Sequence, residues 1–136
     1  MNEVQTAAFD AALPALATFK RTFGRDASPS FVAELHAARE FGLSLHPGPN
    51  ARGADAVDAS GLRYQIKFRG TETLNVDINN FEFDFIVLIN MDENYALGGI
   101  WRIDQRKARE IFTHREKYHK YQVTQRSFKN AAQRVR

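Results

Sequence analysis

The sequence predicts a single α/β domain built on a small mixed sheet. Three observations carry this prediction. The chain has 136 residues, which fits one domain. Apolar residues recur at helical spacing near both ends of the chain. Between these ends, residues 54–103 contain alternating or continuous apolar runs, which are typical of strands.

Two helices are expected before the strands. The large apolar side chains that fall near one stripe of residues 3–23 are Phe9, Leu13, Leu16 and Phe23. Gly24 offers a stop, and Pro14 is expected to split or kink this helix.

The second helix is expected to begin with Ser28 as its N-cap and Pro29 in its first position. It should run to about Phe41 and stop at Gly42. Residues 44–53 are rich in proline and glycine and are expected to form a loop.

A hairpin should follow this loop. Residues 54–58 form its first strand, residues 59–61 the turn and residues 62–69 the second strand. The second strand alternates, so Gln65 and Lys67 share the face opposite its apolar side chains.

Residues 70–82 are polar and are expected to form a loop. The nearly continuous apolar run 83–89 predicts a central strand buried on both faces. Residues 95–103 predict another strand, in which Gly98 and Gly99 mark a bulge and Trp101 lies in the core.

The C-terminal part should be helical. Asp104 can cap a helix that runs to about Phe112, and a short amphipathic helix is expected around residues 128–135. Residues 1–27 would then be an N-terminal helical extension, 28–112 the core and 113–136 a basic C-terminal segment.

Composition excludes several classes of protein. Hydrophobic residues make up 43% of the chain and charged residues 26%, which argues against a disordered chain. The absence of cysteine excludes disulfides, thiolate zinc sites and cysteine nucleophiles. No apolar run approaches a membrane span, and the N-terminus lacks the basic start of a signal peptide. We therefore expect a soluble, cytoplasmic protein with no membrane partner.

The charge is unevenly distributed along the chain. Residues 1–100 contain 8 basic and 13 acidic residues, whereas residues 101–136 contain 11 basic and 3 acidic ones. A basic end on an acidic body fits a polyanionic partner, although a solvated basic tail has the same composition.

Glu34 is an unusual residue in the second predicted helix. With Phe31 as reference, Leu35 lies at about 40°, Ala38 at about 340° and Glu34 at about 300° on the helical wheel. The carboxylate therefore lies within the apolar face, where a charge is costly unless it is paired or binds a metal. Glu40 lies near 180° and is expected in solvent.

The predicted hairpin brings a second carboxylate next to two polar side chains. A three-residue loop of Ala59, Ser60 and Gly61 suits a type I turn followed by a left-handed glycine. In that register Asp55 faces Gln65. Carboxylate and amide oxygens are hard ligands suited to Mg²⁺, and a nearby lysine can hold a phosphate or orient an attacking water.

These residues resemble the PD-(D/E)XK nuclease superfamily, which has the restriction-endonuclease-like fold. The resemblance rests on Glu34 in a helix, on Gly53-Ala54-Asp55 and on Gln65-Ile66-Lys67, and it spans about residues 30–104. It implies an α-β-β-β-α-β core and Mg²⁺-dependent hydrolysis of DNA phosphodiester bonds, with Mn²⁺ as an alternative ion.

The resemblance also implies roles for the four residues. Asp55 would be the central metal ligand, Gln65 the second ligand, Glu34 the outer carboxylate and Lys67 the catalytic lysine. Gly53-Ala54 stands where the family has a proline before the aspartate, and Gln65 stands where the family usually has an acid. The loss of that negative charge should weaken Mg²⁺ binding.

Several basic residues are expected to contact nucleic-acid phosphates, because the guanidinium fork matches phosphate oxygens. Those expected to do so are Arg52, Arg63, Arg69, Arg126 and Lys129, with Arg134 and Arg136 extending the basic C-terminus.

Two other functions stay open at this point. A nuclease fold with a decayed metal site would bind nucleic acid or a protein without cleaving it. Alternatively, the basic and aromatic residues 114–121 could serve an RNA-binding or ribonucleolytic module. DNA is the expected substrate, RNA is not excluded, and a homodimer is expected by analogy.

Overall fold

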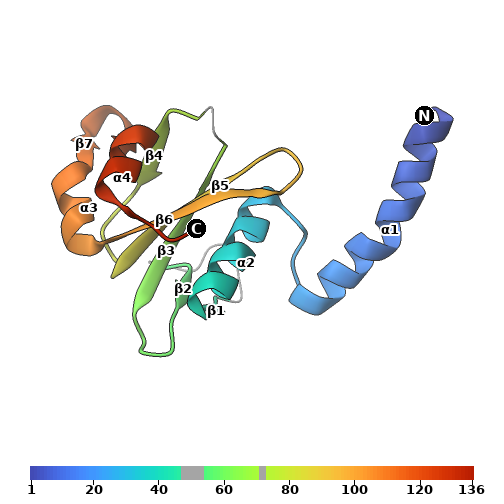
Figure 1. Ribbon diagram of the computed structural model, residues 1–136, viewed down its shortest axis with the longest axis horizontal. Helices are drawn as coiled ribbons and strands as arrows, with labels where there is room; N and C mark the ends of the chain where they lie inside the picture. Colours follow the sequence, from blue (N-terminus) through green and yellow to red (C-terminus); the bar gives the residue numbers. More distant parts are fainter. Residues whose placement is uncertain (47–53, 71–72) are drawn as a thin grey trace.

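The computed structural model describes residues 1–46, 54–70 and 73–136, and it has the predicted mixed α/β architecture (Figure 1). Four α-helices lie in these ranges: α1 (Glu3–Phe23), α2 (Pro29–Phe41), α3 (Gln105–Ile111) and α4 (Gln125–Ala131). The strands of the main sheet are β1 (Ser44–Leu45), β2 (Ala56–Val57), β3 (Arg63–Arg69), β5 (Phe85–Met91), β6 (Leu97–Asp104) and β9 (Gln133–Arg134). The second sheet contains β4 (Asn75–Ile78), β7 (Thr113–Arg115) and β8 (Lys120–Thr124), with a 3₁₀ turn, η1 (Glu116–Tyr118), between β7 and β8.

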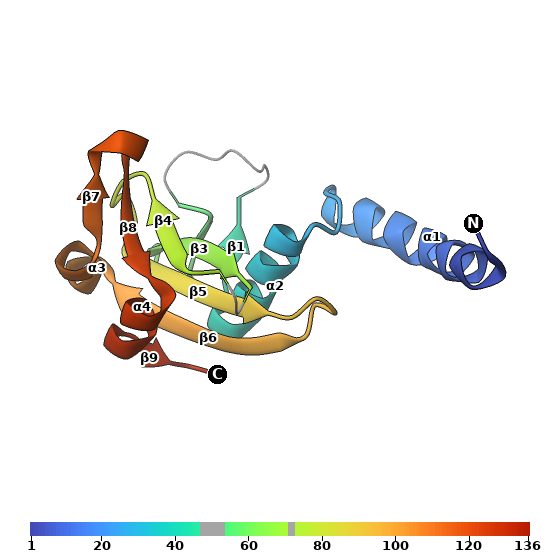
Figure 2. The same cartoon turned by 90° about the horizontal axis from the view of Figure 1, so that it is seen from above.

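Helix α1 is defined by strong local signals at both ends. Asn2 caps it and forms a reciprocal capping box with Gln5, and Gly24 ends it at a φ of 68°. Pro14 lies inside the helix without splitting it, so the expected break is not found. Figures 1 and 2 show α1 projecting from the rest of the molecule.

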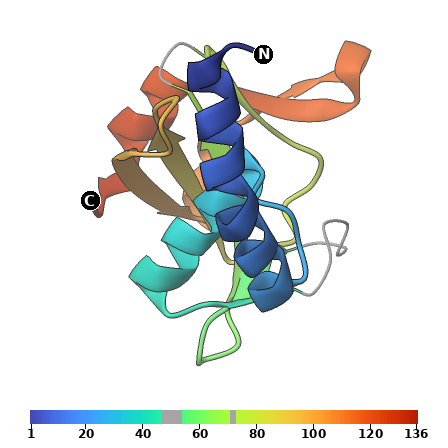
Figure 3. The same cartoon turned by 90° about the vertical axis from the view of Figure 1, so that its right-hand side faces the viewer.

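Helix α2 has the predicted boundaries, with Ser28 as N-cap and Gly42 at its left-handed end. Its residues Phe31, Ala33 and Ala37 are buried. The two small alanines allow the helix to lie close to the sheet, and they pack in one core cluster with residues of β2, β3, β5 and β6. Figures 1 and 2 show α2 between α1 and the main sheet, and Figure 3 shows α1 in front of the rest of the molecule when it is seen from the α1 side.

The main sheet has the order β1-β2-β3-β5-β6-β9. β3 and β5 are parallel, and the other neighbours are antiparallel, so the sheet is mixed as predicted. β5 is buried along nearly its whole length and separates two apolar clusters, one on each face of the sheet. The register of β5 and β6 shifts beside Gly98, which confirms the predicted bulge. Trp101 is buried in the core, also as predicted.

The second sheet corrects the predicted loop at residues 70–82. β4 lies within that range and pairs with β8, which is distant in sequence. Val76 and Ile78 are buried and the alternate positions are not, as in a strand with one buried face. Four alternating residues in a polar segment are too short a pattern to predict this strand from the sequence. β7 and β8 also give regular structure to the basic and aromatic residues 114–121.

Three further expectations at the ends of elements were wrong. Residues 44–45, expected in a loop, form β1 on the edge of the main sheet. The C-terminal helix ends at Ala131, because the following residues extend as β9 and pair with β6. Glu40, expected in solvent, is 21% exposed and accepts a hydrogen bond of 2.8 Å from Arg136.

Among the residues that the structure describes, no helix is both long enough and apolar enough to cross a membrane.

Candidate functional site

The β2–β3 hairpin has the register that the sequence predicts. Ala56 faces Tyr64 and Val57 faces Arg63, and the backbone N–H of Asp55 donates to Tyr64 O at 2.8 Å. Gly61 has a φ of 81°, as the three-residue loop requires. This register places Asp55 beside Gln65.

Side-chain hydrogen bonds tie Asp55 to the return strand. Gln65 Nε2 donates to Asp55 Oδ2 at 3.0 Å, and the backbone N–H of Ile66 donates to the same oxygen at 2.7 Å. Burial raises the pKa of Asp55, while the Ile66 N–H and the charges of Lys67, His46 and Arg25 act in the opposite direction. Asp55 is thus a partly buried carboxylate surrounded by donors and cations.

Glu34 reaches the same region from α2. Its side chain is only 15% exposed. The face that α2 packs on the sheet differs from the predicted one, because it contains Ala33 and Ala37, about 200° and 240° from Phe31 on the helical wheel, so Glu34 lies at the edge of the buried face. Burial raises the pKa of Glu34, the charge of Arg25 lowers it, and the charge of Asp55 raises it further. The two carboxylates therefore repel each other across the site, and a cation between them would stabilise both ionised forms.

Lys67 lies one residue pair further along β3, on the same face as Gln65. Burial lowers the pKa of Lys67, and the nearby charges of Arg69 and Lys120 add to this effect. Asp55 and Asp77 act in the opposite direction. A partly desolvated ammonium close to two carboxylates is typical of a lysine that works on a substrate.

The structure therefore brings together all four residues that the sequence singled out, Glu34, Asp55, Gln65 and Lys67, from α2, the residue before β2, and β3. The four residues are separated along the chain, and Gln65 and Lys67 occupy alternate positions on one strand. The register of one hairpin and the packing of one helix are enough to assemble them.

Arg25 belongs to the site but was not predicted from the sequence. Its Nη1 lies 3.0 Å from Glu34 Oε2, and its guanidinium stacks 3.9 Å from the centre of the Phe31 ring. Arg25 lies in the connection between α1 and α2, where a sequence pattern predicts only a turn. Arg25 precedes Glu34 by nine residues, and Ser28 and Pro29 start α2 between them. This short separation across a recognisable helix start could have suggested that the two side chains pair.

A second sequence-distant group lies around Lys67. Asp77 on β4 is 3.9 Å from Arg69 Nη2 and 3.9 Å from Lys120 Nζ. Within the described residues, Asp77 Oδ1 is the buried side-chain oxygen that lacks a hydrogen-bond partner. Lys120 comes from β8, so only the pairing of β4 with β8 brings it here. The backbone N–H of His46 donates to the backbone oxygen of Asp55 at 3.0 Å, which holds His46 beside this residue.

The predicted phosphate contacts divide into two groups. Arg69 lies close to Lys67, and its Nε donates to Asn75 O at 2.9 Å. Arg63 shares the alternating face of β3 but lies at the other end of the strand, where Asp84 accepts from its backbone N–H at 2.8 Å.

The two predicted contacts on α4 lie elsewhere. Lys129 stacks 4.4 Å from the Trp101 ring, and Arg126 is exposed on the same helix. Neither contributes to the pKa of Asp55 or of Lys67. Arg52 lies outside the described residues.

The donor set fits a weakly held Mg²⁺ ion better than a structural metal. Asp55 and Glu34 provide two carboxylates, and a rotation of the Gln65 amide would present its oxygen beside Asp55. Within the described part of the chain, no group of three or more His, Asp or Glu side chains is placed to hold a metal ion. Mg²⁺ usually keeps several waters and takes one or two protein carboxylates together with substrate phosphate, so the residues present suffice for that mode.

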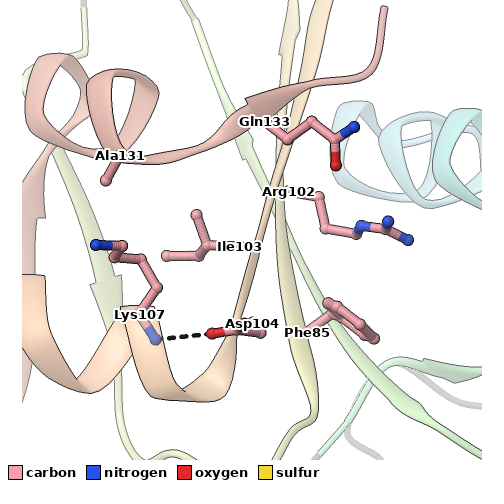
Figure 4. A pocket seen from close by; sticks show the side chains of 7 residues that line it. All are labelled: Phe85, Arg102, Ile103, Asp104, Lys107, Ala131 and Gln133. Carbon is pink, nitrogen blue, oxygen red and sulfur yellow. Dashed lines mark hydrogen bonds between the residues drawn. The ribbon is translucent and has the colours of Figure 1, made fainter.

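A pocket of about 240 Å³ lies away from this cluster, between β5, β6, α3 and the α4–β9 segment (Figure 4). Its cations do not converge on one point. Arg102 turns toward Phe85 and donates to the Tyr64 hydroxyl at 3.2 Å, whereas Lys107 lies on the other side of Ile103 and pairs with Glu110. The candidate site is therefore the cluster at the β2–β3 hairpin.

Comparisons of the chain with protein-family models and with curated proteins found no match. The function is therefore inferred from the site itself.

Proposed function

We propose that this protein is a Mg²⁺-dependent nuclease that hydrolyses DNA phosphodiester bonds. The observation that carries the proposal is the convergence of Glu34, Asp55, Gln65 and Lys67 in one partly buried cluster. Such a cluster destabilises the fold through buried charge, which is typical of groups retained for chemistry.

Each residue has a distinct role in this proposal. Asp55 and Glu34 would hold the ion, with the Gln65 amide oxygen as a neutral third ligand. When bound, Mg²⁺ supplies Lewis-acid stabilisation of the charge that develops on the phosphoryl oxygens. Lys67 donates to a phosphate oxygen or orients the attacking water, and its lowered pKa makes transfer of a proton near neutral pH easier than for an exposed lysine.

The surroundings of Lys67 support a polyanionic substrate. Arg69 and Lys120 lie close enough to Lys67 to lower its pKa, so three cations gather at one place on the surface of β3 and β8. Their mutual repulsion would be relieved by a phosphate backbone. Asp77 partly offsets this repulsion in the free protein.

The order of elements supports membership of the restriction-endonuclease-like fold. A helix carrying the outer carboxylate precedes an antiparallel hairpin carrying the aspartate and lysine, and a buried parallel strand lies next to that hairpin. One feature departs from the expected α-β-β-β-α-β core: β5 and β6 are joined by a short turn, and the helix α3 follows β6.

The hydrogen bond between Gln65 and Asp55 supports a second candidate function. Gln65 donates its amide N–H to Asp55 Oδ2, and Arg25 neutralises Glu34, so both carboxylates already have partners in the free protein. A domain that binds nucleic acid or a protein without cleavage would keep these contacts permanently.

Plasmid nicking tests the nuclease proposal. Supercoiled DNA is incubated with the protein in Mg²⁺, Mn²⁺ or EDTA, beside Asp55→Ala, Lys67→Ala and the control Lys107→Ala. We expect the wild type to nick DNA in Mg²⁺ or Mn²⁺ but not in EDTA. Activity should fall by about 100-fold or more in Asp55→Ala and Lys67→Ala and stay unchanged in Lys107→Ala. Equal activity of wild type and both site variants would exclude this site.

Calorimetric titration with Mg²⁺ separates the two candidates. Heat of binding in the wild type, lost in Asp55→Ala, supports the nuclease. Absence of both ion binding and nicking, with retained DNA binding, supports the non-catalytic function. Competition between DNA and RNA at a fixed salt concentration then identifies the preferred nucleic acid.

A further inference from the structure

Helix α1 carries an apolar stripe that the described chain leaves about half exposed. Phe9, Leu13, Leu16 and Phe23 are 51%, 46%, 52% and 44% exposed, and the structure buries none of the 21 residues of α1. At about 100° per residue, these four side chains fall within an arc of about 80°. A helix with such a stripe is unstable in water unless the stripe is covered.

The C-terminal end of α1 is nevertheless held on the body of the protein. The rings of Phe19 and Phe23 each lie 5.7 Å from the ring of Phe31 in α2, edge to face. The remaining length of the helix extends outward (Figure 2), and Phe9, Leu13 and Leu16 lie on that part of it, each about half exposed. The attachment fixes the direction of α1 without covering it.

A pocket of about 260 Å³ continues the stripe onto α2. It is lined by Phe23, Val32 and Leu35 at its apolar part and by His36 and Arg39 at its polar rim. The free end of α1 carries the complementary features, because Met1 and Val4 are 85% and 79% exposed and Glu3 is acidic.

Charges along α1 also have opposite signs at its two ends. Glu3 and Asp10 lie in the first half, and Lys20 and Arg21 lie in the last turns. This arrangement suits the dipole of a single helix. It also makes the helix complementary to a reversed copy of itself, since acidic and basic ends then lie opposite each other.

We propose that α1 is a self-association surface, on which two copies of this chain pair their α1 helices in antiparallel orientation. A helix of 21 residues is about 30 Å long, so an antiparallel partner brings its N-terminal end to the pocket between α1 and α2 of the first copy. The exposed Met1 of each copy then fills the apolar part of the other's pocket, and Glu3 lies near Arg39. The interface is the same on both chains, as a two-fold dimer requires. This pairing does not depend on metal binding or on nuclease activity.

Sedimentation equilibrium of the full chain tests the proposal. We expect a mass of twice 15.5 kDa at micromolar concentration. Leu16→Asp places a charge in the stripe and should weaken the dimer by about tenfold or more, whereas Ala11→Asp places the same charge on the opposite face and should leave it intact. Circular dichroism of both variants verifies that α1 stays helical. A monomeric wild type, or a dimer equally stable in Leu16→Asp, would overturn the proposal.

Charge reversal tests the antiparallel orientation. Asp10→Lys removes an acid from the end that faces the partner's Arg21, so it should weaken the dimer. Combining Asp10→Lys with Arg21→Glu restores the complementarity and should restore the dimer. In a parallel pair the acidic ends lie together, so the neutralising variant Asp10→Asn would strengthen association, whereas in the antiparallel pair it should weaken association. A stronger dimer in Asp10→Asn would refute the antiparallel arrangement. Nicking activity measured in the same samples shows separately whether the site functions.

Discussion

The contact between Arg25 and Glu34 allows a quantitative prediction about the site. Nη1 and Oε2 are 3.0 Å apart, and the two side chains are 18% and 15% exposed. A hydrogen bond between charged groups contributes about 1.5–3 kcal/mol net. Screening at this partial exposure favours the lower end of that range, and the stacking on Phe31 adds about 0.5–1 kcal/mol. Arg25→Gln should therefore lower the free energy of unfolding by about 2–3 kcal/mol at pH 7.

The dependence of this loss on pH follows from the pKa of Glu34. Burial raises that pKa above the usual value of 4.5, so ionisation of Glu34 makes the folded state less stable as the pH rises. Arg25 opposes this effect, and in Arg25→Gln the pKa of Glu34 should rise further. At a pH below 4.5 Glu34 is protonated with or without Arg25, and the loss should shrink.

Urea denaturation of the wild type and of Arg25→Gln, at neutral pH and at about pH 3.5, measures both effects. Arg106→Gln is a matched control, because Arg106 is 91% exposed on α3 and lies 4.0 Å from Glu110 of its own helix. We expect the control to change stability by less than about 0.5 kcal/mol. A loss of equal size at both pH values, or no loss at pH 7, would refute the electrostatic account.

Three further predictions follow from buried contacts. Burial raises the pKa of Asp55 above 3.8, so the ionised carboxylate makes the folded state less stable as the pH rises above that value. Asp55→Asn should therefore increase the free energy of unfolding at pH 7 and abolish Mg²⁺ binding. Denaturation across a pH series measures the first effect and calorimetry the second, and destabilisation at pH 7 would contradict the first. Asn90→Ala removes the two bonds that Nδ2 donates, at 2.9 Å to Arg69 O and 3.0 Å to Gln125 Oε1, and should lower stability by about 2–4 kcal/mol in urea denaturation. A Cβ on Gly99 would lie 2.4 Å from the Trp101 ring, so Gly99→Ala should lower stability by about 1–3 kcal/mol in the same assay; an unchanged midpoint would contradict it.

Much of the candidate site was predictable because its residues lie in short segments with strong local patterns. Alternation on residues 62–69 placed Gln65 and Lys67 on one face, and the three-residue turn set the register that pairs Asp55 with Gln65. The low exposure of Glu34 agrees with the helical wheel, although the face that α2 buries is centred closer to Ala33 and Ala37 than the predicted one. Each of these inferences depends on backbone geometry within about fifteen residues, where periodicity is informative.

Residues from distant segments could not be predicted in the same way. Asp77 and Lys120 meet Lys67 only because β4 pairs with β8, and a four-residue strand in a polar segment has too weak a pattern to be recognised. Glu40 illustrates the same limit. Its helical phase predicted solvent, but α2 turns Ala33 and Ala37 toward the sheet, so Glu40 lies at the edge of the buried face, and Arg136 pairs with it there.

The sequence by itself determined the mixed α/β class, the boundaries of α2, the hairpin register and the four members of the cluster, because caps, turns and periodicity act over a few residues. Only the tertiary structure decided which charges surround that cluster and that α1 leaves its apolar stripe exposed. Arg25 pairs with Glu34 across a helix start, and Lys120 approaches Lys67 across two sheets. Contacts of this kind depend on how separate elements pack, and the free energy of that packing is shared by the whole chain rather than encoded in any one segment.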